Sequence, residues 1–328
     1  MISQISKKMI NLDQKIINFL DNYFKAKYEI SKASEDASFR KYYRTFFKDK
    51  TYIIMVAPPD KEPIDPFIFL AKSLKEKNIN APELFEINLE LGVIIMQDLG
   101  ATSLLEFFND SNYQEDEMFE RLIHLIYQMQ LNCSGFTNNS YDHKKLKDEL
   151  DLFHTWYLKN INFDQAKLLE IYSYLIERAE SQVQKFVHRD FHSRNLLIND
   201  NEIGVIDFQD ALIGPVTYDL VSILKDAYHE KNAQFIIDKC IRYWQLARDS
   251  FGLTDDFSEF FIDFELMGVQ RHLKILGIFK RLSERDGKHQ YLNDIPVIEK
   301  YLLEIIPNYP KLKYVGQLIL EKRKQDGL

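Results

Sequence analysis

Residues 187–208 read VHRDFHSRNLLINDNEIGVIDF, and this stretch decides the fold. Its apolar runs LLI and IGVI flank a polar turn, NDNE, and this pattern predicts a β-hairpin. A symmetric hairpin pairs Ile198 with Gly204. It also places Asn195 opposite Asp207, so that two oxygen-bearing side chains meet at one end of the hairpin.

The polar residues of this stretch match the needs of phosphoryl transfer. Asn195 and Asp207 offer the hard oxygen ligands that Mg²⁺ takes alongside phosphate oxygens. Asp190 lies on the loop that leads into the hairpin, where a carboxylate can accept the proton of an incoming hydroxyl. We therefore predict ATP and Mg²⁺ as cofactors, Asp190 as the catalytic base and the other two residues as metal ligands. The alternative is an ordinary hairpin with incidental polar residues.

Residue periodicity divides the chain into two parts. The segment 28–57 is strand-like and 91–96 is an apolar strand, whereas the chain beyond Gly100 is mainly helical. These patterns predict an α+β fold with a small sheet-dominated lobe, 1–98, and a larger helical lobe, 99–328. The helices predicted from 3.6-residue periodicity are 13–24, 67–77, 118–131, 146–158, 166–183, 221–228, 233–247 and 257–281.

Composition limits the classes of partner. The 328 residues carry a formal net charge of -8, which disfavours a nucleic-acid or anionic-membrane surface and favours a small-molecule substrate. Lys7 and Lys8 interrupt the N-terminal apolar residues, and no apolar run approaches the length of a membrane span, so we expect a cytoplasmic protein. Cys133 and Cys240 have no metal-ligand spacing and are expected to be buried free thiols. The oligomeric state is left open.

Several segments together resemble the bacterial N-acetylmuramate/N-acetylglucosamine anomeric kinases. These enzymes belong to the protein-kinase-like superfamily, which also contains aminoglycoside phosphotransferases and choline kinases. The resemblance runs from about residue 15 to 305 and implies a two-lobed kinase fold with an antiparallel sheet. It implies transfer of the ATP γ-phosphate to the anomeric hydroxyl of an amino sugar. The segments that carry it are 36–43, 55–59, 97–100, 206–211, 214–220, 270–274 and 285–288.

The nucleotide side departs from the kinase pattern. There is no Gly-rich loop, and the strand 52–57 lacks the phosphate-binding Lys. Our hypothesis is that Ser38 and the neighbouring backbone cover the phosphates while Arg40 or Arg44 supplies the missing charge. Alternatively, these arginines are only surface residues. The hinge residues that the resemblance places against adenine are Met96, Gln97 and Leu99.

The acceptor side is expected near the catalytic loop and on the basic helix 269–285. The arginines and lysine of that helix could face an acidic substrate, although a solvated charged face is the alternative. The short segment between Asp207 and Tyr218 disfavours peptide substrates. Asp219 resembles a buried residue that supports the catalytic loop. The predicted acceptor-binding residues are His192, Asp210, Arg271, His272 and Lys274, with Arg281 and Arg285 on the same helix.

Two other functions remain open at this point. One is a related kinase acting on an aminoglycoside, choline or another alcohol, for which a polycationic acceptor would favour clustered acidic residues. The other is an inactive nucleotide-binding module, suggested by the absent strand Lys. Retention of Asp190, Asn195 and Asp207 together favours an active kinase over the second of these.

Overall fold

The computed structural model describes residues 12–35, 39–109, 113–137 and 139–327. The chain forms two compact units. The first comprises Met1–Ser103 with Leu196–Gln209, and the second comprises Leu104–Asn195 with Asp210–Leu328. The sequence patterns assigned all residues after 98 to one lobe, whereas the contacts group the hairpin with the first unit.

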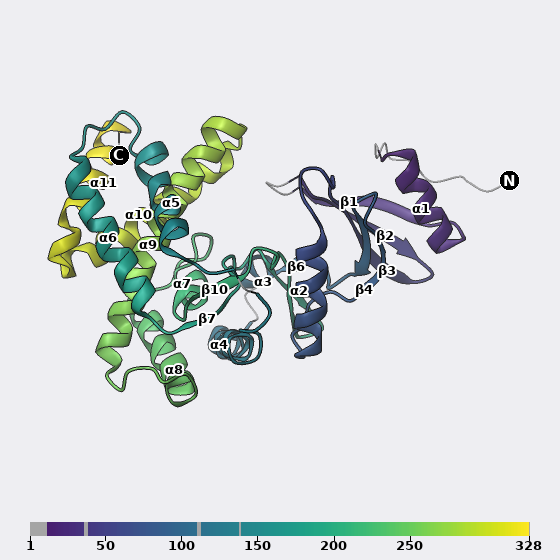
Figure 1. Ribbon diagram of the computed structural model, residues 1–328, viewed down its shortest axis with the longest axis horizontal. Helices are drawn as coiled ribbons and strands as arrows, with labels where there is room; N and C mark the ends of the chain where they lie inside the picture. The colour runs from purple at the N-terminus through teal and green to yellow at the C-terminus, as the bar shows by residue number, and fades with distance from the viewer. Residues whose placement is uncertain (1–11, 36–38, 110–112, 138, 328) are drawn as a thin grey trace. The chain divides into compact units, whose positions relative to one another are not determined.

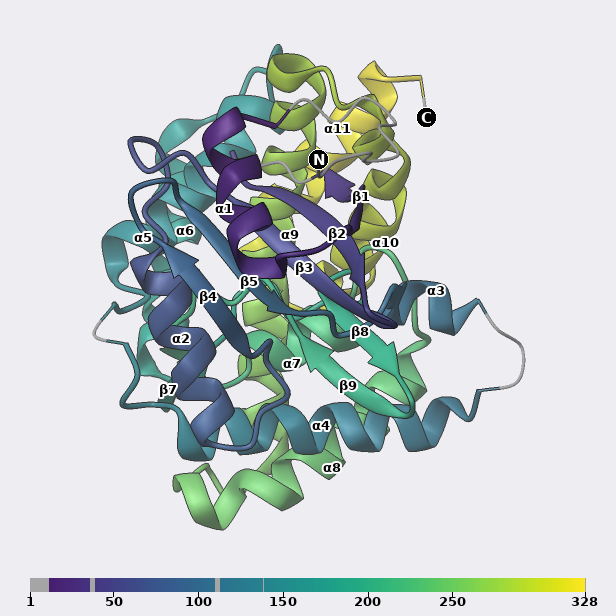
Figure 2. The same ribbon diagram turned by 90° about the vertical axis from the view of Figure 1, so that its right-hand side faces the viewer.

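The first unit is built on a five-stranded antiparallel sheet with the strand order β1-β2-β3-β5-β4. Its helices α1 and α2 are seen in Figures 1 and 2. The helices are α1 (Gln14–Phe24) and α2 (Asp65–Glu76). The strands are β1 (Glu29–Glu35), β2 (Lys41–Phe47), β3 (Lys50–Val56), β4 (Leu84–Asn88) and β5 (Val93–Gln97).

Helix α1 covers one face of this sheet. Asp13 caps the helix, because its carboxylate accepts a hydrogen bond from the backbone N–H of Lys15 at 2.7 Å. The buried side chains of α1 lie one turn apart and therefore share a face. They pack with residues of β2, β3 and β5 in one apolar core, formed by Ile16, Leu20, Phe24, Tyr28, Tyr43, Ile54, Val93 and Ile95.

The predicted hairpin exists, but its predicted register is wrong by one residue. Strands β8 (Leu196–Asn199) and β9 (Glu202–Val205) pair Leu197, not Ile198, with Gly204. The reason is a two-residue turn at Asp200 and Asn201, with φ values of 46° and 65°. Asp and Asn tolerate this left-handed conformation, which matches the twist of paired strands. Strand β6 (Thr102–Ser103) pairs with the other edge of β8.

The second unit is helical and surrounds a 30-residue helix, α9 (Phe257–Asp286). Helices α5, α6, α7 and α10 pack against α9, which is why most of its central residues are buried (Figure 1). The two-stranded sheet of this unit pairs β7 (Gln184–Val187) with β10 (Leu212–Pro215). The other helices are α3 (Leu104–Phe108), α4 (Glu115–Asn132), α5 (His143–Leu152), α6 (Gln165–Ser181), α7 (Tyr218–Leu224), α8 (Ala233–Phe251), α10 (Ile295–Ile305) and α11 (Lys313–Gln325).

Four short helical turns complete this unit. They are the π-turn η1 (Phe153–Tyr157) and the 3₁₀ turns η2 (His289–Asp294), η3 (Ile306–Asn308) and η4 (Pro310–Leu312). Gly277 of α9 lies against the chain just before η1, where a Cβ atom would come within 2.4 Å of the backbone of Leu152. Only glycine permits this close approach between the two segments.

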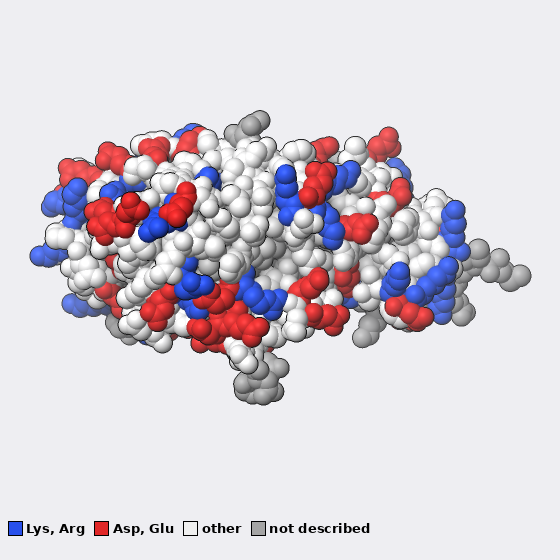
Figure 3. Space-filling model, turned by 90° about the horizontal axis from the view of Figure 1, so that it is seen from below, with Lys and Arg blue, Asp and Glu red and all other residues white. Residues whose placement is uncertain are grey.

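The surface and the helices give two further observations. Among the described residues, no helix has the length and apolar character needed to cross a membrane. On the face shown in Figure 3, basic and acidic side chains are interspersed. That face therefore carries no broad basic patch of the kind that binds nucleic acid.

Candidate active site

The loop between β7 and β8 holds the predicted catalytic base. Asp219, in the first turn of α7, is fully buried and accepts two backbone hydrogen bonds from this loop. The N–H of His188 donates to Oδ2 at 2.7 Å, and the N–H of Arg189 donates to Oδ1 at 3.1 Å. Arg189 has φ of 76°, a strained conformation for a non-glycine residue, which these bonds stabilise. Asp219 thus has the supporting contacts that the sequence predicted.

Further hydrogen bonds close the loop on itself. The side-chain amide of Asn195 donates to the backbone oxygen of Asp190 at 3.1 Å, and the N–H of His192 donates to the same oxygen at 3.0 Å. The N–H of Ser193 donates to Oδ2 of the buried Asp226 at 2.9 Å. The backbone from the predicted base to the predicted metal ligand is therefore fixed before any substrate binds.

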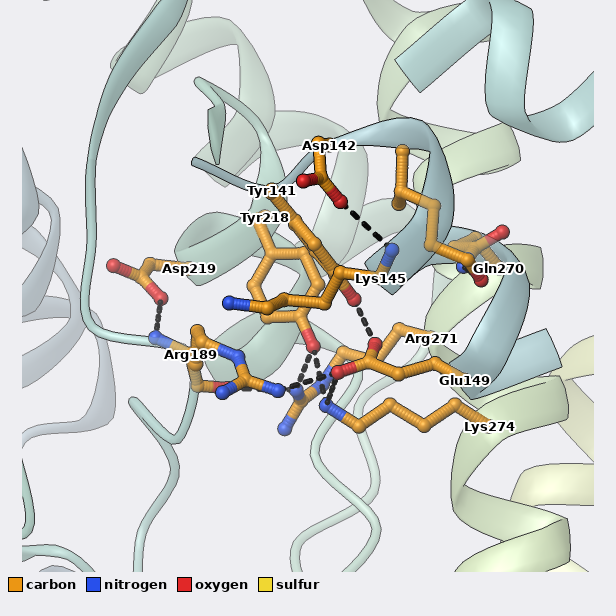
Figure 4. A network of polar contacts seen from close by, with 11 residues as sticks. Tyr141, Asp142, Lys145, Glu149, Arg189, Tyr218, Asp219, Gln270, Arg271 and Lys274 are labelled. Carbon is orange, nitrogen blue, oxygen red and sulfur yellow. Dashed lines mark hydrogen bonds and ion pairs between the residues drawn. The ribbon is translucent and has the colours of Figure 1, made fainter. Parts of the chain in front are cut away.

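Helix α9 contributes two buried cations to this loop. Arg271 donates from Nη1 to the backbone oxygen of Arg189 at 2.9 Å and to the hydroxyl of Tyr218 at 3.0 Å. Lys274 donates to the same hydroxyl at 3.1 Å. Figure 4 shows both side chains converging on Tyr218. Arg271 and Lys274 lie three residues apart and so share one face of α9.

A buried carboxylate from α5 joins these cations. Glu149 is 7% exposed and forms ion pairs with Arg189 and with Lys274, the latter at 3.1 Å. The hydroxyl of Tyr141 also donates to Glu149 (Figure 4). We name Tyr141, Glu149, Arg189, Tyr218, Arg271 and Lys274 the Glu149 cluster. Buried charges require such pairing, because an isolated charge is costly to remove from water.

The cluster determines the charge of Asp190. Burial by itself raises the pKa of Asp190, but electrostatic interactions with Lys274, His192 and Arg271 outweigh burial and lower the pKa to about 2. The carboxylate is therefore ionised at neutral pH. Such a low basicity suits a predicted base that orients a hydroxyl and accepts the proton late, as a loose phosphoryl-transfer transition state requires.

The pKa values of Asp219 and Glu149, two other buried carboxylates that contact the loop, shift in opposite directions. Burial raises the pKa of Asp219 to about 7, although the backbone N–H groups of His188 and Arg189 lower it. Burial also raises the pKa of Glu149, but Lys274 and Arg189 outweigh burial and the net shift is downward. Glu149 is therefore ionised at neutral pH, as its two cationic partners require.

Asp207 lies two residues after the end of β9, the second strand of the hairpin. It has φ of 63°, and its Oδ1 accepts a hydrogen bond from the side chain of Gln209 at 2.7 Å. The next residue, Phe208, is fully buried and stacks on Phe67 of α2 with ring centroids 5.0 Å apart. This packing fixes the chain on which Asp207 lies. Asp210 is exposed.

The two candidate arginines on the nucleotide side have protein partners. Arg44 in β2 donates from Nε and Nη2 to the carboxylate of Asp98 at 2.6 and 3.0 Å, and from Nη2 to the backbone oxygen of Gly100 at 2.8 Å. Arg40 precedes β2 and forms an ion pair with Glu62 at 3.1 Å. The structure thus gives Arg44 a structural role. Ser38 lies outside the described residues.

The predicted hinge residues end the sheet of the first unit. Met96 is buried and pairs with strands on both sides. The side-chain oxygen of Gln97 accepts hydrogen bonds from the Lys75 side chain and the backbone N–H of Glu83, both at 3.3 Å. Leu99 lies beyond the last paired residue and packs against Gly204.

His272, although predicted to bind the acceptor together with Arg271 and Lys274, is not part of the Glu149 cluster. It is fully buried, its Nε2 lies 3.1 Å from the backbone oxygen of Lys225, and its ring stacks on Tyr301. Burial lowers the pKa of His272 to about 3, so the ring is neutral. The structure therefore gives His272 a core-packing role. Arg281 is half-buried, whereas Arg285 is exposed and pairs with Asp286, so neither belongs to the cluster.

Sequence reasoning gave no role to four members of the cluster, one of which, Arg189, directly precedes Asp190. Glu149 and Tyr141 lie some forty residues before the loop, and no local motif marks them. Tyr218 could have been found, because it belongs to a segment, 214–220, that carries the resemblance. The missing information was which helix faces which, and only the tertiary structure supplies it.

Comparison with known proteins identifies the family of this chain. The family model described as the phosphotransferase enzyme family matches residues 29–251. The N-acetylmuramate/N-acetylglucosamine kinase of Pseudomonas aeruginosa is 36% identical over 89% of this chain and 88% of its own length. The kinase of the same name from Neisseria meningitidis serogroup B is 34% identical over 94% of this chain and 95% of its own length.

Solved structures are similar in fold. Aminoglycoside phosphotransferase APH(2'')-Ib, solved with ADP bound, has a TM-score of 0.59 at 16% identity, covering 88% of this chain and 97% of its own. An ethanolamine kinase from Plasmodium vivax has a TM-score of 0.61 at 11% identity, covering 90% of this chain and 91% of its own. These similarities confirm the predicted α+β, protein-kinase-like fold. The chain belongs to the phosphotransferase enzyme family and, within it, to the family of bacterial N-acetylmuramate/N-acetylglucosamine kinases.

Proposed function

We propose that this chain transfers the γ-phosphate of ATP to the anomeric hydroxyl of N-acetylmuramate or N-acetylglucosamine, giving the sugar 1-phosphate and ADP. The names of its relatives support this acceptor class. The observation that carries the proposal is the ionised Asp190 on a loop that Asp219 and Arg271 hold in place.

The proposed reaction is a single displacement. The anomeric oxygen forms a bond to the γ-phosphorus, the bond from that phosphorus to the bridging oxygen of ADP breaks, and the hydroxyl proton passes to Asp190. Arg271 and Lys274 act through the charge and position of Asp190, because both are buried and paired within the protein. His192 and Asp210 are proposed to contact the acceptor, since both lie within the segments that flank the catalytic residues.

Asn195 and Asp207 are the residues that would hold Mg²⁺. Asn195 directly precedes β8, and Asp207 lies two residues beyond the end of β9. The Asn195 side-chain nitrogen donates a hydrogen bond to the loop, which fixes the orientation of the amide, and its amide oxygen is the atom of a type that Mg²⁺ accepts as a ligand. An amide oxygen and a carboxylate fit Mg²⁺, which takes few protein ligands and completes its shell with water and phosphate. When bound, the ion neutralises charge on the transferring phosphate.

The nucleotide contacts are proposed at residues 96–99 and at the chain before β2. Because Met96 and the side chain of Gln97 are already paired within the sheet, Leu99 is the best placed of the three hinge residues to present backbone groups to adenine. Ser38 and Arg40 are proposed to lie over the phosphates. Arg40 would then exchange Glu62 for a phosphate oxygen. The cytoplasmic location expected from the sequence stays a prediction.

The test is ADP release from MgATP with N-acetylmuramate, N-acetylglucosamine, kanamycin and choline as separate acceptors. The Asp190→Ala variant serves as the blank, and phosphorus NMR identifies the product. Turnover with the amino sugars, yielding an acid-labile 1-phosphate that the variant does not form, supports the proposal. Turnover with kanamycin or choline alone would assign the chain to a different acceptor class.

A further inference from the structure

Arg194 differs from the other cations of the catalytic loop. It lies four residues beyond Asp190, its side chain is 40% exposed, and its guanidinium carbon is 3.6 Å from the centre of the Tyr228 ring. Stacking of this kind holds the planar guanidinium flat while its N–H groups point outward from its rim. The loop therefore presents an oriented cation toward solvent.

The charge of Arg194 is only loosely matched within the protein. In the part of the chain that the structure describes, its one ion-pair partner is Asp294, at 3.7 Å, which is beyond hydrogen-bond distance. By contrast, Arg271 and Lys274 are 4% and 6% exposed and are bonded to Tyr218. Of these three cations, Arg194 is thus the most exposed and the least tightly paired.

The support beneath Arg194 is preorganised. A single buried carboxylate, Asp226, accepts the backbone N–H of Ser193 at 2.9 Å and that of Tyr228 at 3.0 Å. The backbone of the residue before the arginine and the backbone of the tyrosine on which it stacks are therefore bonded to the same carboxylate. The buried ring of Phe279 contacts the rings of Tyr228 and Tyr291. The ring on which Arg194 stacks is therefore itself held by packing against a buried side chain. A site fixed in this way loses little entropy when a ligand binds.

We propose that Arg194, stacked on Tyr228, binds the carboxylate of the acceptor and thereby selects N-acetylmuramate over N-acetylglucosamine. This inference rests on the proposed function. N-acetylmuramate carries a lactyl carboxylate on the same ring as the anomeric hydroxyl, two ring positions away. Arg194 lies four residues after Asp190 on the same loop, and the proposal places the carboxylate at the arginine and the anomeric hydroxyl at the aspartate. A guanidinium can bind a carboxylate through two parallel N–H···O bonds, which N-acetylglucosamine cannot accept.

The experiment compares kcat/KM for the two sugars in the unaltered protein and in Arg194→Gln. Hydrogen bonds to charged groups suggest a loss of about 10- to 100-fold for N-acetylmuramate. We expect this loss to appear mainly in KM and to exceed clearly any loss for N-acetylglucosamine. Arg194→Lys keeps the charge without the planar fork, so it should recover part of the loss.

Arg248→Gln is the matched control. Arg248 also lies over an aromatic ring, that of Trp244, and pairs with a neighbouring acid, Asp249, but it belongs to α8. This variant should leave the ratio between the two sugars unchanged. An equal loss for both sugars in Arg194→Gln, or no loss for either, would overturn the inference while leaving the kinase function intact. No turnover of either sugar by the unaltered protein would overturn the proposed function and this inference with it.

Discussion

Replacing Glu149 with glutamine tests whether the buried cluster holds the catalytic loop. The substitution keeps the shape of the side chain but removes its charge. It leaves Arg189 and Lys274 buried without their shared carboxylate, and the Tyr141 hydroxyl loses a charged acceptor. Because one side of a buried ion pair is removed, the cations cannot recover their hydration in place.

The expected cost is large for a change of one atom. Removing one partner of a buried ion pair lowers the free energy of unfolding by about 3 to 5 kcal/mol. The turnover number should fall as well, because Glu149 holds the side chain of Arg189, whose strained backbone leads directly into Asp190. A fall in kcat of at least ~10-fold is expected if the loop shifts by even a fraction of an ångström.

The pH dependence of this cost has a definite sign. The pKa of Glu149 lies below its ordinary value of 4.5 in the folded protein. A depressed carboxyl pKa stabilises the fold above the unfolded pKa, and that contribution is lost as pH falls through the folded pKa. The difference in stability between the unaltered protein and Glu149→Gln should therefore be constant from pH 6 to 8. It should shrink below about pH 4.5.

The assay is denaturant unfolding followed by circular dichroism, with kcat measured on the same samples. Glu284→Gln is the control, because Glu284 pairs with Lys159 at the surface and its loss should cost less than about 1 kcal/mol. Equal destabilisation by the two variants, or an unchanged kcat in Glu149→Gln, would refute the role assigned to the cluster.

Three further predictions concern the base, the close helix contact and the arginine of β2. Asp190→Asn should lower kcat at least ~10²-fold and leave the circular dichroism spectrum unchanged. In the unaltered protein, kcat should show no titration of Asp190 between pH 5 and 8, because the pKa of this residue is about 2. Gly277→Ala should lower the free energy of unfolding by about 1 to 3 kcal/mol, since the added Cβ would lie 2.4 Å from the backbone of Leu152. Gly268→Ala, on the same helix, has room for a Cβ and should not destabilise the protein. A double-mutant cycle of Arg44→Ala and Asp98→Ala should give a coupling energy of about 0.5 to 3 kcal/mol in the free energy of unfolding. If Arg44→Ala raised the KM for ATP without loss of stability, the structural role of Arg44 would be contradicted.

Much of the fold could be predicted because its signals are local. The apolar spacing of Ile16, Leu20 and Phe24 behind Asp13 is sufficient to predict α1, since cap and periodicity both lie within one segment. The hairpin was equally visible from its turn residues. Its register was not, because a turn centred on Asn201 and one shared by Asp200 and Asn201 have the same composition, and only the backbone dihedral angles distinguish them.

The site was predictable only where its residues lie in one motif. Asp190, Asn195 and Asp207 could be named because a fixed spacing relates them. Glu149 and Tyr141 could not be named, because their role depends on α5 packing against α9, more than a hundred residues later. The role of Arg44 likewise depends on the tertiary structure, because it is set by the partner that the side chain meets. An alternating strand pattern shows which residues of β2 share a face, but it does not show that this face meets Asp98.

The cations on and around the catalytic loop are of two kinds, those that are buried and paired and one that is exposed, and local sequence patterns do not separate them. Helical periodicity correctly places Arg271 and Lys274 on one face of α9, but it is silent on whether that face turns toward solvent or toward another helix. Since α9 is enclosed, those cations require a buried anion, and Glu149 satisfies them. They help to keep Asp190, the predicted base, ionised before any acceptor binds. Recognition of an acidic acceptor then requires a cation outside that balanced group, and Arg194 meets this requirement, because it is exposed, stacked and loosely paired.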